Sequence, residues 1–209
     1  MKTITLILLV VVMMSTLLFW GPNSSQAQVY DFEKMAKNVV NMLSVAGFFV
    51  AKNLDVINTH NAKLGQPIPK DQPYSYKGID PVTFASTITK DFTIRTGIVV
   101  RFVSEGKGKY GPRNPANLPD DWESMQIIKF KDAHLPPGEG SGEFLKMGVT
   151  KKVVYRYFFP LYVNELCLKC HGDPSTSPSG DGKDVAGHSM EGYTLGDLRG
   201  GISLTFPVQ

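Results

Sequence analysis

Residues 151–171 read "KKVVYRYFFPLYVNELCLKCH" and combine a clear strand pattern with the most informative motif of the chain. The first part is rich in β-branched and aromatic side chains, which favour strands. Successive side chains of a strand point to opposite faces, so two sets are predicted to lie back to back. They are Val153, Tyr155, Tyr157 and Phe159 on one face, and Val154, Arg156 and Phe158 on the other. Pro160 predicts an edge strand or a bulge, because proline cannot donate a ladder hydrogen bond.

The end of this stretch, "CLKCH", holds both cysteines of the chain and one of its four histidines. Cys-x-x-Cys-His is the attachment signature of c-type haem. Two thiols add to the two vinyl groups on one porphyrin edge, and the two intervening residues let the loop span them. The next residue then projects beneath the ring. The motif therefore predicts one haem c, held covalently by Cys167 and Cys170, with His171 as the proximal iron ligand.

Two cysteines have three other common uses in proteins. An exported protein can form a disulfide, and Cys-x-x-Cys is also a redox motif. That redox motif normally opens a helix after a strand, whereas Gly172-Asp173-Pro174 predicts that any helix here is cut short. A structural zinc site needs four ligands, and the chain has no second cysteine pair. The histidine directly after Cys170 therefore favours haem.

The N-terminus resembles a secretory signal. Lys2 is followed by the apolar run Ile4–Trp20 and then by the small-residue cleavage box Ser25-Gln26-Ala27. We expect a signal peptide over residues 1–27; an uncleaved anchor is the alternative, since the run is at the low end for a membrane span. Both outcomes predict a periplasmic protein, and bacteria attach haem c outside the cytoplasm.

The remaining residues, 28–209, have the length of one domain. The chain carries 22 basic and 19 acidic residues, interspersed, for a net charge of +3. This pattern indicates a solvated surface and argues against nucleic-acid binding. Membrane contact is expected only through an uncleaved N-terminus.

The coarse pattern predicts an α+β fold. Apolar residues recur every three or four positions over Val29–Leu64, which predicts a long helix, bent near Gly47 and ending at Gly65. Further helices are expected at Pro81–Lys90, with Asp80 as N-cap, and from "LPDDWESMQIIKF". "TGIVVRFVSE" and "LRGGISLTFPV" predict strands, which gives an antiparallel sheet with helices on one side. "PSTSPSGDGKDVAG" predicts an exposed, mobile loop.

The segments "YRYFFPLYVNELCLKCHGDP", "RNPANLPDDWE" and "GYTLGDLRGGISLTFP" together resemble a known family. It is the family of haem-c-binding, PAS-like sensor domains, found alone in the periplasm or as extracytoplasmic input domains of bacterial sensor kinases. The resemblance implies a PAS-like antiparallel sheet flanked by helices, one covalent haem, and a role in redox or small-gas sensing.

The chain departs from that family in two respects. No kinase or receiver segment follows the last expected strand, so we expect a signal to leave through a partner protein. Some members place a cysteine thiolate on the distal side of the haem, where this chain reads Gly78-Ile79-Asp80-Pro81. Ile79 cannot ligate iron, so the resemblance does not supply the distal ligand.

Several residues are candidates for that sixth ligand. His60 is expected to continue the buried face of the long helix and is the first candidate. The others are His134 and His188 in loops, and Met147 and Met190, taken as the methionines nearest the haem segment; a vacant site lined by Ile79 is the alternative. Two histidines would give a low-spin, electron-transferring iron, methionine would raise its potential, and an open site would bind nitric oxide or carbon monoxide.

Polar and aromatic residues complete the expected site. Arg113, Asn114 and Arg199 are predicted to contact the haem propionates, because a guanidinium forms paired hydrogen bonds with a carboxylate. The alternative is a surface salt bridge, such as Arg199 with Asp197. The aromatic row of the strand at 151–164 is expected to be sheet core, with walling of the haem as the alternative.

These features predict a binding module, a haem sensor that changes its contacts with a partner protein. A plain electron-transfer cytochrome is the alternative. An enzyme such as a peroxidase is not expected, because no distal arginine–histidine pair is recognisable.

Overall fold

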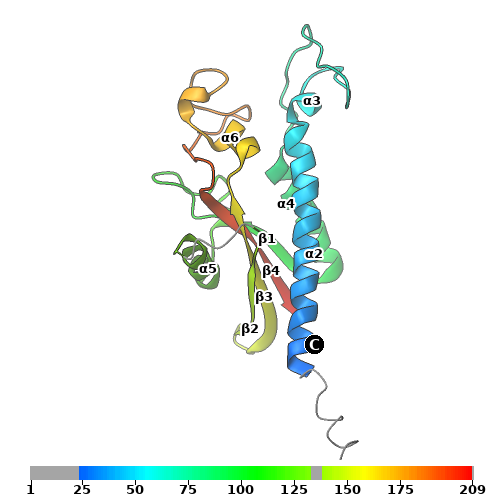
Figure 1. The fold of residues 1–209 in the computed structure, drawn as a ribbon, viewed down its shortest axis with the longest axis vertical. Coiled ribbons are helices and arrows are strands. Elements are labelled where there is room, and N and C mark those ends of the chain that lie inside the picture. The colour runs from blue at the N-terminus through cyan, green and yellow to red at the C-terminus, as the bar shows by residue number, and fades with distance from the viewer. Residues whose placement is uncertain (1–23, 133–137, 209) are drawn as a thin grey trace, which may run out of the picture.

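A computed structural model describes residues 24–132 and 138–208 as an α+β fold built on a four-stranded antiparallel sheet (Figure 1). The strands are β1 (Val99–Val103), β2 (Ser141–Met147), β3 (Lys152–Tyr162) and β4 (Leu198–Pro207), in the order β1-β4-β3-β2. The predicted fold class is therefore confirmed, and the arrangement is consistent with a PAS-like fold.

Helices cover both faces of this sheet rather than one (Figure 1). α2 (Ser24–Lys52) and α4 (Pro81–Thr96) lie on one face and α5 (Asp121–Asp132) on the other, while α3 (Leu54–Asn58) and α6 (Glu165–His171) lie at one end. Short 3-10 turns at Pro115–Asn117 (η1) and Pro174–Thr176 (η2) complete the elements. Each face therefore has its own apolar core.

The two faces of β3 divide as its alternation predicts. Tyr155 and Tyr157 are fully buried in the core under α2, where Phe32 stacks on Tyr155 with ring centroids 5.4 Å apart. Phe158 points to the other face and stacks on Phe130 of α5 at 5.7 Å. The aromatic row is thus sheet core, as expected.

The prediction for Pro160 is half right. β3 is an interior strand, so the expected edge position is wrong. β2, which was not predicted, begins at Ser141, and Ser141 pairs with Phe158. Among residues 24–132 and 138–208, Pro160 is therefore paired only with Gly201 of β4. A register shift follows between Leu161 and Tyr162, in keeping with a bulge. Within the described part of the chain, the proline therefore lies where one flank of β3 is unpaired.

The long N-terminal helix differs from its prediction. It runs through Gly47, breaks at Asn53, and resumes only as α3, which ends at Asn58. The side chain of Asn53 donates to the carbonyl of Phe49, a bond that competes with the helical backbone pattern. His60 consequently lies beyond the helix and is exposed, so it does not continue the buried face.

The predicted start of α4 is confirmed. Asp80 caps the helix by accepting hydrogen bonds from the amides of Val82 and Thr83, each at 2.9 Å, and Pro81 occupies the first turn. The helix extends beyond the expected Lys90 to Thr96, where Gly97 closes it with a φ of 73°.

The predicted N-terminal signal lies mostly outside the described residues, which begin within it at Ser24. In the ranges 24–132 and 138–208, every helix is too short or too polar to span a membrane. The cleavage box belongs to the first turn of α2.

α5 is attached to the sheet by a buried ion-pair cluster. The guanidinium of Arg156 bonds Asp120 at 2.8 Å and Glu123 at 2.9 Å, and it lies 4.3 Å from the ring centroid of Trp122. The Glu123 side chain is fully buried, and that of Arg156 is 4% exposed. A buried charge that loses its partner is costly, because neither water nor another ion replaces the partner.

We therefore expect Glu123→Ala to lower the free energy of unfolding by about 3 kcal/mol. Urea titration followed by far-ultraviolet circular dichroism measures this change. The matched control is Asp91→Ala, which removes an exposed partner of Arg95 on α4 and should change stability by less than about 0.5 kcal/mol. Equal effects of the two substitutions would contradict the cluster's role.

Candidate functional site

The Cys-x-x-Cys-His motif lies on α6, the seven-residue helix that directly follows β3. Asn164 caps this helix by accepting from the amides of Leu166 and Cys167. The predicted early stop is confirmed, since the helix ends at His171. It does follow a strand, however, so secondary structure alone does not separate a haem motif from a redox pair.

The two thiols lie close together on α6. Cys167 and Cys170 are both free, and they are three residues apart on one helix, which places them on neighbouring positions of its surface. Burial, together with the nearby carboxylate of Asp184, raises the pKa of Cys170 to about 11. The Cys170 thiol is therefore protonated at neutral pH. The histidine that follows it, and not the thiols, favours a haem motif over a redox pair.

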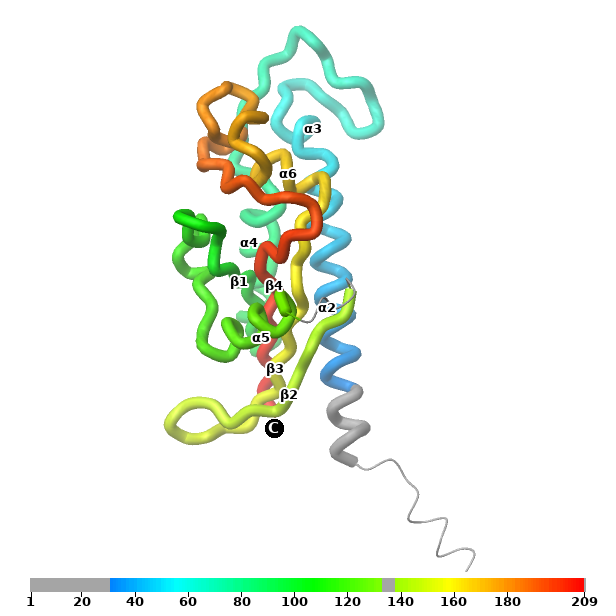
Figure 2. The backbone as a smooth tube through the Cα atoms, turned by 60° about the vertical axis from the view of Figure 1, so that its left-hand side comes forward, coloured from blue at the N-terminus to red at the C-terminus, as the bar shows by residue number. Residues whose placement is uncertain are grey.

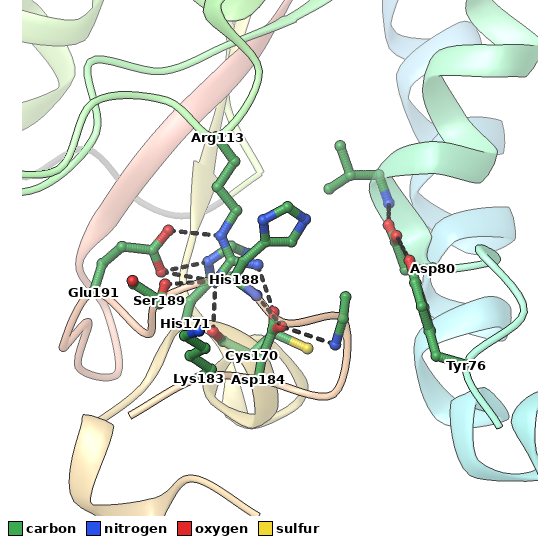
Figure 3. Close-up of polar contacts among 12 residues, drawn as sticks. Tyr76, Asp80, Arg113, Cys170, His171, Lys183, Asp184, His188, Ser189 and Glu191 are labelled. Atoms are coloured by element: carbon green, nitrogen blue, oxygen red, sulfur yellow. Dashed lines mark hydrogen bonds and ion pairs between the residues drawn. The ribbon is translucent and has the colours of Figure 1, made fainter. Parts of the chain in front are cut away.

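The imidazole of His171 is held by a single hydrogen bond at one nitrogen. Its Nδ1 lies 2.8 Å from Oε2 of Glu191, and its side chain is 14% exposed (Figure 3). Burial lowers the pKa of His171, although Glu191 opposes the shift, so the ring is neutral near pH 7. With Nδ1 as the donor, Nε2 presents a lone pair, and it has no hydrogen-bond partner within residues 24–132 and 138–208. This is the tautomer that a metal ligand needs.

Glu191 is a buried carboxylate with two partners besides His171. Arg113 donates to it twice, from Nε to Oε1 at 2.8 Å and from Nη2 to Oε2 at 3.1 Å, and Nη2 of Arg199 lies 3.8 Å from Oε1. Burial alone would raise the pKa of Glu191, but the hydrogen bonds from His171 and Arg113 outweigh it and lower that pKa to about 2. Glu191 is therefore ionised at neutral pH.

Arg113 connects three segments at this point (Figure 3). Besides Glu191, it donates to Oδ2 of Asp184 at 2.6 Å and to the backbone carbonyl of Cys170 at 2.7 Å. The loop that contains Asp184 was predicted to be exposed and mobile. Most of its residues are exposed, as predicted. Asp184 is buried, however, and accepts from the amides of Ala186 and His188, so the loop is also internally hydrogen-bonded.

Backbone bonds fasten the end of α6 to the entry of β4. The amide of Tyr193 donates to the carbonyl of His171 at 2.8 Å, and that of Gly192 to the carbonyl of Gly172 at 2.9 Å. The ring of Tyr193 meets the His171 ring edge-on, with centroids 6.2 Å apart. The guanidinium of Arg199 lies 4.9 Å from the centroid of the Tyr193 ring. The motif is thus fixed by residues that follow it in the chain.

The segment before α4 stands across from α6 (Figure 3). Tyr76 donates to Oδ2 of Asp80 at 2.5 Å, and the charge of Asp80 contributes to the raised pKa of Cys170. Ile79, in the same segment, is 43% exposed. Figure 2 shows the loop at residues 59–78 and the loop at 172–192 at the same end of the molecule. Two chain segments therefore face each other around the motif.

The candidates for a sixth ligand fall in different places. His60 is exposed just after α3, whose Asp55 pairs with Lys169 of α6 at 3.3 Å. His188 is exposed in the loop held by Asp184, and His134 lies outside the described residues. Met147 is not near α6: it pairs with Lys152 at the hairpin, about ten residues of β3 away from α6, or roughly 33 Å. Met190, beside Glu191, is 1% exposed.

The residues predicted to contact propionates are already engaged with other partners. Arg113 bonds the two buried carboxylates, Arg199 donates to the hydroxyl of Ser104 at 2.5 Å, and Asn114 caps η1 through the amide of Ala116. Asp197 pairs with Lys107, not with Arg199. The propionate contacts remain predictions.

Sequence reasoning missed the two buried acids that support the motif. Asp184 and Glu191 stand in "DGKDVAGHSMEGY", a loop-like sequence in which no spacing marks a buried carboxylate. One signal in the sequence could have pointed to these acids. It is Arg113 in "GPRNP", because an arginine that packs into the protein needs an acidic partner. Only the tertiary fold pairs residues 71 and 78 positions apart.

Comparisons with known proteins agree with this fold. A family model described as Tll0287-like matches residues 26–207. Among solved structures, the crystal structure of the cyanobacterial haem protein Tll0287 is similar, with a TM-score of 0.56 and 22% sequence identity, covering 85% of this chain and 96% of that one. At this identity the likeness shows a shared fold. No curated protein shows a significant match to the chain.

Gly172 is where the motif meets the rest of the protein, and it tolerates no side chain. A Cβ at Gly172 would lie 2.6 Å from the backbone carbonyl oxygen of Leu168, whereas one at Gly111 would meet nothing within 4 Å.

We expect Gly172→Ala to displace the end of α6 and lower the melting temperature by several degrees, and Gly111→Ala to leave it unchanged. Thermal unfolding followed by circular dichroism measures both. Equal melting temperatures for the two variants would show that α6 adapts.

Proposed function

Because the chain belongs to the Tll0287-like family, we propose that it is a periplasmic haem protein that acts as a redox or small-gas sensor. One haem c is attached through Cys167 and Cys170, and His171 is the proximal iron ligand. The protein is a binding module and not an enzyme. The haem character of the cyanobacterial relative supports this proposal, and the geometry around His171 carries it.

The residues present fit such a group. Two free thiols share one short helix, and the adjoining imidazole has its Nδ1 occupied by Glu191 and its Nε2 lone pair available. An iron-ligating histidine almost always donates its other nitrogen in this way, which fixes the tautomer and the ring orientation. The bound haem supplies one-electron redox chemistry and a coordination position on the iron.

The chain's own residues would each have one task in this function. Cys167 and Cys170 would hold the group, His171 would coordinate it, and Glu191 would keep the imidazole neutral and oriented. Arg113 connects Glu191 to Asp184, so the coordinating histidine is linked through two ion pairs to the surface loop at residues 177–189. A change at His171 therefore has a hydrogen-bonded route to a surface that a partner protein can contact.

An electron-transfer cytochrome is the second candidate. The exposed His60 follows α3, which contacts α6 through the ion pair of Asp55 and Lys169, and its imidazole would give a six-coordinate iron with two histidines. The segment before α4 stands across from the motif (Figure 3), and the apolar Ile79 in that segment offers no iron ligand, which favours the sensor.

Covalent attachment is tested by removing the thiols. We expect Cys167→Ala with Cys170→Ala, co-expressed with a haem maturation system, to give no haem-dependent peroxidase stain on a denaturing gel. His171→Ala should keep the stain but change the Soret spectrum. Wild-type protein made without the maturation system is the control. Staining of the double variant, or an unchanged spectrum of His171→Ala, would refute the assignment of these residues.

Ligand binding separates the sensor from the carrier. We expect the reduced protein to bind carbon monoxide and nitric oxide rapidly, with a shifted Soret band, because Ile79 offers no ligand. His60→Ala should leave that spectrum unchanged. An inert six-coordinate spectrum in the wild type that becomes gas-reactive in His60→Ala would instead establish the carrier.

A further inference from the structure

The neutral imidazole of His171 donates its hydrogen bond to an unusually strong acceptor, Glu191. The acceptor is an ionised carboxylate whose side chain is 3% exposed. Resting on the haem function proposed above, we propose that Glu191 is a positioning residue that sets the donor strength of His171 and thereby lowers the reduction potential of the bound haem. Arg113 limits this effect by sharing the same carboxylate.

The physical reason is the pull of the carboxylate on the Nδ1 proton. A charged acceptor draws that proton away from the ring more strongly than a carbonyl does, which makes the ring more electron-rich and a more basic ligand. A more basic ligand stabilises the ferric state over the ferrous state. Because Glu191 is almost excluded from water, its charge is little screened.

Arg113 sets the size of this effect. Its two hydrogen bonds to Glu191, at 2.8 Å and 3.1 Å, occupy both carboxylate oxygens, including the Oε2 that accepts from His171. The guanidinium therefore competes with the imidazole for the same oxygen. With these bonds in place, Glu191 attracts the Nδ1 proton less than a free carboxylate would.

Asp184 provides a matched control. Its side chain is 1% exposed, it bonds Arg113 at 2.6 Å, and its charge acts on Cys170 of the same motif. Its described hydrogen bonds go to Arg113, to loop amides and to the Cys170 thiol, and none goes to His171. A potential shift caused merely by losing a buried negative charge would therefore appear in Asp184→Asn as well.

The test is a redox titration of the haem-loaded full chain, combined with electron paramagnetic resonance of its ferric state. Glu191→Gln keeps the shape and an acceptor oxygen but removes the charge. It should favour the ferrous form about tenfold, which is a rise of about 59 mV for a one-electron couple, and it should change the g values. Asp184→Asn should shift the equilibrium less than about threefold and leave the g values unchanged.

Arg113→Lys is the second variant, in case Glu191→Gln fails to fold or to retain haem. It keeps a cation but loses the paired hydrogen bonds, so Glu191 should pull harder on His171 and the potential should fall. Equal shifts in Glu191→Gln and Asp184→Asn with unchanged g values, no shift in Glu191→Gln, or a constant or higher potential in Arg113→Lys would each overturn the inference. A colourless wild-type protein would instead refute the haem function itself, and this inference with it.

Discussion

The organisation of the site depends on one buried negative charge. The carboxylate of Glu191 is almost excluded from water, and such a charge is tolerated only when its lone pairs are satisfied by well-placed donors. His171 and Arg113 are those donors, and they come from α6 and from the loop after β1. Satisfying this one group therefore fixes three distant segments of the chain relative to each other.

The sheet makes that arrangement possible. β3 is buried on both faces, with Tyr155 under α2 and Phe158 under α5, so its direction is set by two cores at once. Because α6 follows β3 with only a short connection, the strand aims the motif at the end of the sheet. β4 pairs with β3 along its length and brings Glu191, which precedes it, to the same place. Two adjacent interior strands thus deliver both halves of the site.

Local chemistry explains which features the sequence alone predicted. The faces of β3, the Asp80 cap of α4 and the early end of α6 depend on near neighbours in the chain, and each was predicted correctly. β2 was missed because its glycine-containing sequence has a weak strand pattern and gains order by pairing with β3. The break at Asn53 was missed because a side chain–backbone bond there overrides an apolar periodicity that continues beyond it.

In the site as well, features set by neighbouring residues were predicted, and features set by distant contacts were missed. The five residues of "CLKCH" carry their chemistry in their own spacing, so thiols and imidazole were recognisable at once. Asp184, Glu191 and the true partners of Arg113 depend on contacts between residues more than seventy positions apart. No periodicity in one sequence reports such contacts. The same limit placed Met147 near the motif, although the length of β3 separates them.

The backbone bonds from Gly192 and Tyr193 to Gly172 and His171 have a consequence for biogenesis. Every partner in those bonds follows the motif in the chain, as do Asp184 and Glu191. Because a chain is made from its N-terminus, the motif therefore emerges before those residues. The motif stays open to its surroundings until β4 has been made, and pairing of that strand with β3 closes it last.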